Sequence, residues 1–298
     1  MRQLWGKLPV IVRAVIVGSA ISTFGHIPAS TLLYTNLKIW SAVPWSLPFV
    51  VLYFWFFWQY LKGRWWPSST AETRRRHLRA PNLSAPVWRW ALIAGGLAMA
   101  ALMALHGVLA PVTPPTYEVY YPLFRDVPPL TLAVFILALS TGAGIVEEAA
   151  YRGYMQGPIE RRHGPVIAIA VVTVFFVQLH FTAAQRMSAP RTLLITVASL
   201  IYGILVHLSG SIVPGIILHA MGDALGLFLL WFVWAQSATR AHPAGFAAAM
   251  RTPTFWLNVA ELVILTAAAV WAFRKLKRAA TAVRLPAESP PAPAARTR

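Results

Sequence analysis

The chain has 298 residues, of which 57% are hydrophobic and only 12% are charged. Soluble globular domains carry about 25% charged residues, so this composition argues against a water-soluble enzyme and excludes a disordered or fibrous chain. The formal net charge is +17, but the basic residues lie between apolar runs, and there is no cysteine for a disulfide framework. In that position basic residues orient a protein in a bilayer and contact anionic head groups, so we predict a membrane protein with no nucleic-acid partner.

A membrane-spanning helix needs about 20 consecutive, mostly apolar residues. Eight segments meet this requirement and predict an all-α fold, a polytopic membrane protein with about eight transmembrane helices. The segments follow one another too closely to leave room for a soluble domain, so residues 1–278 are predicted to form a single transmembrane domain, and the Ala- and Pro-rich segment 279–298 a disordered tail. In chain order the predicted spans are 10–34, 39–60, 88–110, 130–156, 166–184, 192–208, 212–235 and 255–273.

The distribution of basic residues predicts the orientation of the chain. With a cytoplasmic N-terminus and alternating spans, 20 of the 26 Lys and Arg residues fall on the cytoplasmic side. Seven of these belong to the loop region 62–89. The opposite threading contradicts the positive-inside rule. We therefore expect both termini in the cytoplasm and a multi-pass protein of the cell membrane, most simply a bacterial inner membrane.

Acidic side chains inside apolar segments are the first candidates for function, because a charge at membrane depth costs at least a few kcal/mol. Four of the nine acids lie in such segments, and we set aside Glu261, which lies near the end of the last span. The other three are Glu147, Glu148 and Asp223.

The fourth span carries a pair of glutamates followed by an arginine. On a helix, Glu148 and Arg152 are four residues apart and share a face, so they can form an ion pair. Glu147 is rotated by about 100° from Glu148 and can point elsewhere. This spacing indicates one carboxylate held by an arginine and a second carboxylate free for chemistry. If the helix ends near Gly157, Glu147 lies about 15 Å from that end.

Two histidines in other spans complete a candidate site. His180 ends the fifth span, and His219 precedes Asp223 by one helical turn in the seventh. One glutamate and two histidines can supply a general base together with oxyanion or metal partners for water-driven acyl transfer. The remaining histidines in spans (His26, His106 and His207) have no acidic residue nearby in the sequence and are interpreted as structural.

Three motifs in a fixed order carry a resemblance to a known family. These are E-E-x-x-x-R at Glu147, Glu148 and Arg152, then F-x-x-x-H at Phe176 and His180, then H-x-x-x-D at His219 and Asp223. Together they resemble the CPBP family of intramembrane proteases, which comprises the CAAX prenyl endopeptidases and bacterial bacteriocin-processing or immunity homologues. The resemblance covers about residues 128–235.

The resemblance implies an endopeptidase that cleaves a membrane-associated protein or peptide within or at the edge of the bilayer. It assigns water activation to Glu147 and support of the site to Glu148 with Arg152. It assigns to His180 and His219 the orientation of the water, stabilisation of the oxyanion, or metal binding. Asp223 stands where many members have Asn, and an ionised carboxylate cannot donate a hydrogen bond to an oxyanion. Asp223 can instead fix a histidine tautomer, ligate a metal or remain protonated.

The sequence leaves two alternatives open. A divalent metal such as zinc, with candidate ligands His180, His219, Glu147 and Asp223, is compatible with three-helix ligation, although the chain has no H-E-x-x-H motif; a glutamate-type mechanism without metal is the other possibility. The alternatives to a protease are a non-catalytic partner or immunity protein on the same fold, and a proton-coupled transporter that uses the same buried groups.

Overall fold

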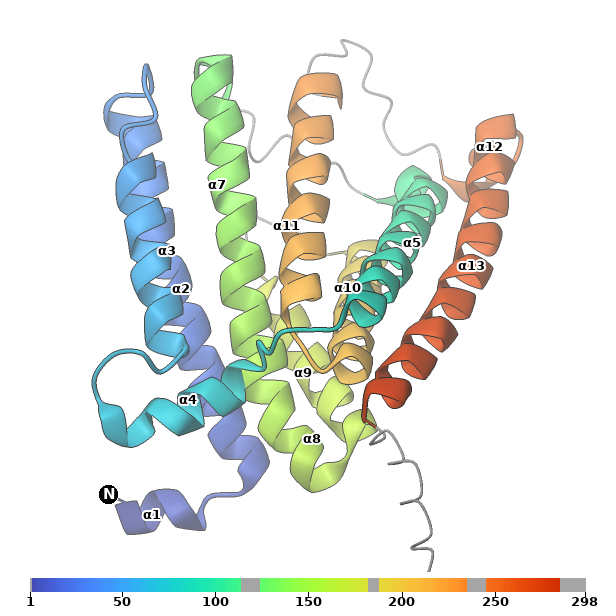
Figure 1. The fold of residues 1–298 in the computed structure, drawn as a ribbon. Coiled ribbons are helices and arrows are strands. Elements are labelled where there is room, and N and C mark those ends of the chain that lie inside the picture. Colours follow the sequence, from blue (N-terminus) through green and yellow to red (C-terminus); the bar gives the residue numbers. More distant parts are fainter. Residues whose placement is uncertain (1, 114–123, 182–187, 235–244, 285–298) are drawn as a thin grey trace, which may run out of the picture.

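The computed structural model describes residues 2–113, 124–181, 188–234 and 245–284, and these residues form helices joined by turns, with no strand among them (Figure 1). This confirms the predicted all-α class. The first helices in chain order are α1 Arg2–Lys7, α2 Val10–Ile39, α3 Leu47–Leu61, the short turn η1 Ser68–Thr70, α4 Ala71–Leu78, α5 Ala85–Leu109 and η2 Ala110–Val112. They are followed by α7 Pro129–Glu147, the π-helix η3 Glu148–Gln156, α8 Gly157–His163, α9 Pro165–Leu179, α10 Ala189–Ser209, α11 Val213–Phe228, the π-helix η5 Leu229–Trp234, α12 Phe246–Ala249 and α13 Pro253–Arg284.

Six of these helical stretches are long and apolar enough to cross a membrane, so the chain is a multi-pass membrane protein. The second and fifth predicted spans correspond to α3 and α9, which are apolar but have only 15 residues each. The second begins later than predicted because residues 40–46 form a turn held by Asn36. The buried Asn36 amide donates to the carbonyls of Trp40 and Val43, each at 2.9 Å, and its Oδ1 accepts from the amide of Ser46.

Helix α7 occupies the middle of the bundle and packs against α2 and α3 on one side and α11 on the other, while α5 pairs with α13 at the far edge (Figure 1). Small residues allow the close contacts. A Cβ atom on Gly144 of α7 would lie 2.8 Å from the Ile216 carbonyl oxygen of α11, and one on Gly18 of α2 would lie 3.0 Å from the Ala150 carbonyl oxygen. Close backbone approach of this kind is how membrane helices associate.

We expect Gly144→Ala to lower stability by about 1–3 kcal/mol, because the added methyl meets a backbone atom that cannot rotate away. Gly96→Ala on α5 is the matched control, since a Cβ there meets nothing within 4 Å. Alanine also favours helix over glycine by up to about 1 kcal/mol, so this variant should be unchanged or more stable. Thermal unfolding of both variants in one detergent measures the difference, and equal melting temperatures would contradict the close α7–α11 contact.

The turn between α8 and α9 brings the fourth and fifth predicted spans level with each other. The helix does not end at Gly157, as the sequence suggested, but continues through α8 to His163, and Gly164 then reverses the chain with a φ of 81°. Glu148 lies 16 residues before Gly164, and His180 lies 16 residues after it. An antiparallel pair of helices joined at Gly164 therefore places the two side chains at the same depth. No tilt of α9 is needed to explain how they meet.

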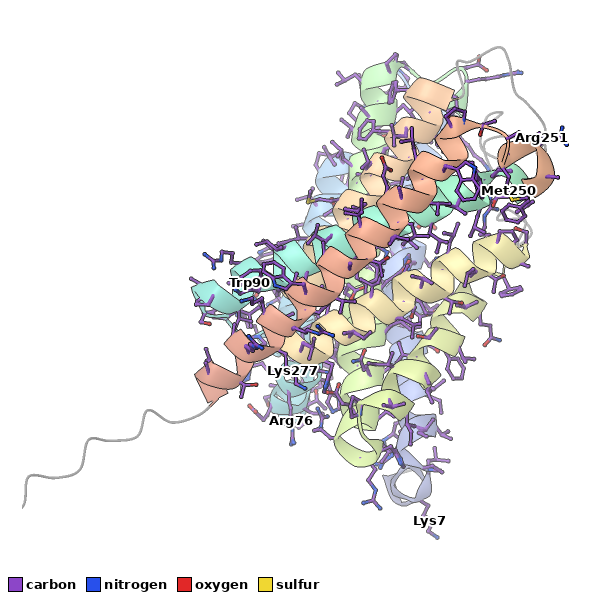
Figure 2. All side chains as sticks on the ribbon, turned by 90° about the vertical axis from the view of Figure 1, so that its right-hand side faces the viewer. Lys7, Arg76, Trp90, Met250, Arg251 and Lys277 are labelled. Atoms are coloured by element: carbon purple, nitrogen blue, oxygen red, sulfur yellow. The ribbon has the colours of Figure 1, made fainter. Side chains whose placement is uncertain are left out.

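The two ends of the bundle differ in charge. Figure 1 places the N-terminus and the end of α13 at the same end, and Figure 2 shows Lys7, Arg76 and Lys277 toward that end, with Arg251 toward the other. We call the end that carries α1, α4 and α8 the basic end. Helix α13 continues to Arg284, so the first six residues of the predicted disordered tail are helical. Residues 285–298 lie outside the described residues.

Candidate active site

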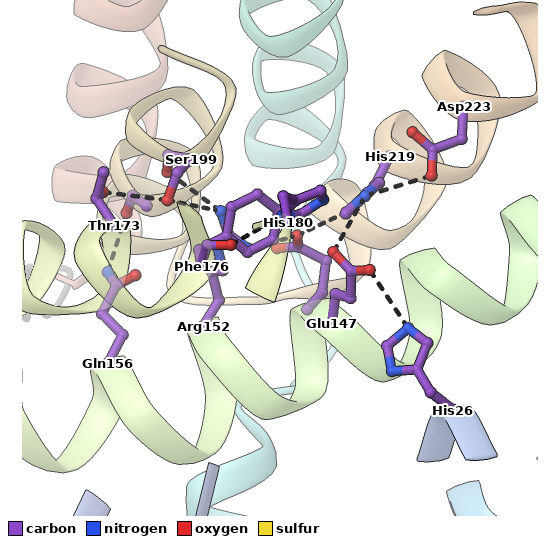
Figure 3. A network of polar contacts seen from close by, with 12 residues as sticks. His26, Glu147, Arg152, Gln156, Thr173, Phe176, His180, Ser199, His219 and Asp223 are labelled. Atoms are coloured by element: carbon purple, nitrogen blue, oxygen red, sulfur yellow. Dashed lines mark hydrogen bonds and ion pairs between the residues drawn. The ribbon is translucent and has the colours of Figure 1, made fainter. Parts of the chain in front are cut away.

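Four helical segments bring the candidate residues together in the middle of the bundle (Figure 3). Glu147 is the last residue of α7, and Glu148 is the first residue of the π-helix η3. His180 follows the end of α9, His219 and Asp223 lie on α11, and α2 adds His26. π-Helical segments are rare and occur frequently at functional sites. Here the segment begins at the glutamate pair, where a change in helical repeat alters the directions of neighbouring side chains.

Glu148 and Arg152 form a fully buried ion pair, as their spacing predicts. Both side chains are 0% exposed, and Arg152 Nη1 lies 3.3 Å from Glu148 Oε1. The same carboxylate oxygen accepts a hydrogen bond of 3.0 Å from Nδ1 of His219. Glu148 therefore connects η3 to α11 through a charged group. Breaking such a buried pair costs more than breaking a surface pair, because the remaining charge stays out of water.

Aromatic rings and hydroxyls hold the Arg152 guanidinium in place. Its centre lies 4.3 Å from the centroid of the Phe176 ring and 5.3 Å from that of Tyr202, which are cation–π distances. Arg152 Nη2 also donates to the carbonyl oxygen and the hydroxyl of Ser199, at 3.3 and 3.2 Å. Phe176, the first residue of the second motif, thus contacts both the arginine and His180, whose ring centroid is 4.9 Å away.

Glu147 is 7% exposed and is not free of partners, contrary to what the sequence suggested. Its Oε1 lies 3.3 Å from Nε2 of His26, and its Oε2 lies 3.7 Å from Nε2 of His219. Nδ1 of His26 is 2.9 Å from the carbonyl oxygen of Ser22, which can only accept, so Nδ1 carries a proton. A hydrogen bond between His26 Nε2 and Glu147 then requires one further proton between them. Glu147 and His26 therefore hold a proton between Oε1 and Nε2, and the second carboxylate oxygen, Oε2, lies next to this pair.

His219 is the centre of the cluster and is fixed by three neighbours. Tyr202 stacks on its ring with an interplanar angle of 9° and a centroid distance of 4.9 Å. With Nδ1 bound to Glu148, the opposite nitrogen Nε2 faces two carboxylates, Glu147 at 3.7 Å and Asp223 at 3.6 Å. The Asp223 side chain is 43% exposed, against 9% for that of Glu147. The Asp223 carboxylate is therefore much less buried than that of Glu147.

His180 lies level with the cluster but has a different anchor. Its Nδ1 is 2.8 Å from the carbonyl oxygen of Phe176, which can only accept, so Nδ1 is the donor. The Phe176 ring lies between the two histidines, with its centroid 6.2 Å from that of His219. All six residues expected from the sequence are thus gathered in one region, and Figure 3 shows His180 beside this group.

Local sequence explains how α11 presents His219. Ser211 Oγ accepts from the amide of Val213 at the start of the helix, and Pro214 occupies an early position, as their residue types predict. Gly215 lies one turn before His219, and a Cβ there would be 2.9 Å from Glu148 Oε2. Glycine at this position therefore makes room for the buried carboxylate that holds His219.

Two histidines interpreted as structural from the sequence have acidic partners. His26 contacts Glu147, and Nδ1 of His207 lies 2.6 Å from Glu160 Oε1, a carboxylate that also pairs with Arg79 at 2.8 Å. These contacts contradict the premise that no acidic residue accompanies the two histidines, because Glu147 and Glu160 are distant from them in sequence. A signal for His26 exists in the sequence. The small residues Gly18, Ser22, Gly25 and Ala29 recur every three or four positions, which marks a face of close helix packing.

Within the described residues, no group of three or more His, Asp or Glu side chains has an arrangement that can hold a metal ion. The closest set consists of His219 with Glu147 and Asp223, in which the single Nε2 nitrogen faces both carboxylates. Nδ1 of His219 and of His180 are already used by Glu148 and by the Phe176 carbonyl. The side chains as placed therefore do not fit a zinc site, and no chemical step below uses a metal.

Comparison with known proteins agrees with the motifs. Searches of curated proteins and of solved structures find no match. A family model described as type II CAAX prenyl endopeptidase Rce1-like matches residues 129–225, which are 97 of the 298 residues. The matched segment contains Glu147, Glu148, Arg152, His180, His219 and Asp223, while His26 lies outside it. The resemblance drawn from the three motifs is confirmed over this segment, which is similar to the Rce1-like CAAX prenyl endopeptidases.

Proposed function

We propose that this protein is an intramembrane endopeptidase that hydrolyses a peptide bond of a membrane-associated protein or peptide. The observation that carries the proposal is the position of Glu147, a buried carboxylate with one oxygen held by His26 and the other facing His219. A general base must be held in place and must have a free lone pair for the proton that it abstracts. Glu147 Oε2, which has no hydrogen-bond partner among the described residues, meets this requirement.

In the proposed reaction, Glu147 removes a proton from a water molecule, and the hydroxide attacks the carbonyl carbon of the scissile bond. The negative charge that develops on the carbonyl oxygen is stabilised by a proton on Nε2 of His219, whose other nitrogen is anchored to Glu148. Collapse of the tetrahedral intermediate breaks the C–N bond, and the proton on Glu147 moves to the departing nitrogen. One water is consumed, and one carboxylic acid and one amine are formed.

Arg152 and Asp223 have supporting roles in this scheme. Arg152 pairs with Glu148 and balances its charge, and the carboxylate held in this way keeps His219 oriented. Asp223 lies 3.6 Å from Nε2 of His219 and places a carboxylate beside the nitrogen that donates to the oxyanion. An aspartate can therefore replace the Asn that relatives have at this position, because it acts through His219 and does not contact the oxyanion.

The protein is proposed to lie in the cell membrane with its basic end in the cytoplasm, because Lys7, Arg76 and Lys277 lie toward the same end. A cleavage assay with purified protein and membrane-associated peptides tests the activity. Cleavage that survives a chelator supports glutamate-type chemistry, and loss of cleavage that returns with zinc would replace it with metal-dependent chemistry. Folded protein that shows no cleavage but carries solute flux driven by a pH gradient would replace the protease with a transporter.

We expect His26→Ala to lower kcat by about 10- to 100-fold with little change in KM, because Glu147 loses the group that holds it. The pH dependence of kcat/KM should also change, since a titrating partner of the base is removed. His26→Gln, which retains an N–H donor, should restore part of the rate. His163→Ala is the control, because His163 is an exposed histidine at the end of α8. An unchanged kcat and pH profile in His26→Ala would show that His26 does not support catalysis.

A further inference from the structure

An open cavity of about 630 Å³ lies outside the active site at the basic end, between α2, α4 and the η3–α8 segment. Sites for small ligands usually have volumes of about 300–1,000 Å³. The cavity has two unlike parts. Arg13, Arg74, His77 and Arg161 contribute polar groups, and Val10, Val17 and Ile21 of α2 contribute an apolar wall.

The guanidinium of Arg74 is buried in the wall of this cavity and is only partly satisfied. Arg74 is 5% exposed, and its Nη2 donates to the carbonyl oxygens of Trp65 and Pro67. Among the described residues, its Nε and Nη1 atoms have no hydrogen-bond partner. Buried N–H groups of a charged side chain are costly to leave unpaired. The Tyr60 ring lies 4.2 Å from the guanidinium carbon and makes a cation–π contact with it, but it supplies no acceptor for these N–H groups, which an anionic ligand would supply.

Among the residues that the structure describes, no carboxylate lines the cavity, so the positive charge of its described lining is not balanced from within. The acidic residues nearby in sequence already have basic partners, Glu72 with Arg75 and Glu160 with Arg79. Burial, together with the charges of Arg161 and Arg76, lowers the pKa of His77 to about 4. The imidazole is therefore neutral at pH 7, and the guanidinium groups of Arg13, Arg74 and Arg161 remain as the fixed charges.

The apolar wall of the cavity runs in the direction that an acyl chain takes in a bilayer. Val10, Val17 and Ile21 lie on one face of α2, which begins at Val10 and is one of the helices long enough to span a membrane. Over the 11 residues from Val10 to Ile21 the helix rises about 16 Å. The wall therefore runs from the end of the span, where head groups lie, toward the hydrocarbon region. Basic pockets between transmembrane helices at this level are the sites that anionic lipid head groups occupy.

We propose that this cavity binds one anionic phospholipid, with the phosphate against Arg74, Arg13 and Arg161 and an acyl chain along α2. Zwitterionic lipids carry an ammonium group that opposes the cations, and free phosphate lacks the chain that covers the wall. The same helix carries His26 four turns beyond Val10, so the bound lipid would fix the part of α2 that reaches Glu147. The proposal does not depend on the peptidase activity.

The test measures binding rather than cleavage. Purified protein in a neutral detergent is titrated with short-chain phosphatidylglycerol, with phosphatidylcholine of the same chain length, and with inorganic phosphate, and stoichiometry is read by native mass spectrometry and thermal unfolding. We expect saturable binding of one phosphatidylglycerol, and no comparable effect from the other two probes. Phosphatidylcholine that binds as tightly would overturn the role of the cations. Inorganic phosphate that binds as tightly would overturn the role of the apolar wall.

Two exposed or half-buried cations can be removed without disturbing the core. Arg13→Gln and Arg161→Gln should each weaken phosphatidylglycerol binding by about five-fold, the contribution of one basic residue near an anionic lipid. Arg162→Gln is the matched control, since Arg162 is the exposed neighbour of Arg161 on α8 and does not line the cavity. Equal weakening in all three variants would indicate diffuse surface charge and overturn the site. Saturable stabilisation by a soluble acidic peptide, with none by phosphatidylglycerol, would assign the cavity to a protein ligand instead.

Discussion

Replacement of Glu147 by glutamine is expected to lower kcat by at least about 10³-fold, with the protein still folded. The amide has nearly the same shape as the carboxylate but cannot accept a proton from water, so the loss reflects the missing general base, which typically contributes 10²–10⁴-fold. The contact with His26 at 3.3 Å can persist, because an amide oxygen also accepts a hydrogen bond. Initial rates of cleavage of a membrane-associated peptide, together with the melting temperature of each variant, give the result.

Glu261→Gln is the matched control for this experiment. It makes the same chemical change on an exposed glutamate of α13, far in sequence from the site. We expect its rate to equal that of the unmodified protein. If Glu147→Gln retains the full rate while Glu261→Gln does the same, Glu147 is not the base and the proposed reaction is wrong. If Glu147→Gln lowers both the rate and the melting temperature, the experiment is repeated with Glu147→Asp, which keeps the carboxylate and shortens the side chain.

Removal of the Arg152 side-chain charge is expected to give the largest loss of stability, about 3–5 kcal/mol for Arg152→Met. The reason is that Glu148, which is 0% exposed, would lose the guanidinium 3.3 Å away that balances its charge. Methionine preserves much of the apolar contact with Phe176 and Tyr202, so the loss reports the charge rather than a cavity. Denaturation in mixed micelles compares the free energies of unfolding.

A second substitution, in the partner Glu148, distinguishes the effect of the broken ion pair from general damage to the core. Glu148→Gln combined with Arg152→Met removes both charges, and it should recover a substantial part of the stability lost in Arg152→Met. Arg162→Met, on the exposed surface of α8, is the control for loss of one arginine and should be within about 0.5 kcal/mol of the unmodified protein. A double variant that is less stable than Arg152→Met would show that the charge of Glu148 is compensated by other groups, among which His219 is the nearest.

The cluster could be predicted from sequence because each motif spans only a few consecutive residues. The spacing of Glu148 and Arg152, or of His219 and Asp223, fixes which side chains share a face before any packing is known. The cost of placing carboxylates in apolar segments then distinguishes them from packing residues. The contact of His26 with Glu147 joins residues 121 positions apart in the chain. Nothing in local spacing predicts such a contact, although the small-residue face of α2 marks the side of the helix on which to look.

The amino-acid sequence by itself determined the helical membrane class, the positions of the apolar segments and the six residues of the cluster, because hydrophobic runs and intrahelical spacing are local properties. The tertiary structure decided three further points. Continuation of the helix to His163 places His180 level with Glu148, the packing of α2 gives Glu147 a second histidine, and the meeting of α2, α4 and α8 creates the basic cavity. Each of these depends on which helix faces meet and where the chain reverses, and such contacts between distant segments arise only when the helices pack.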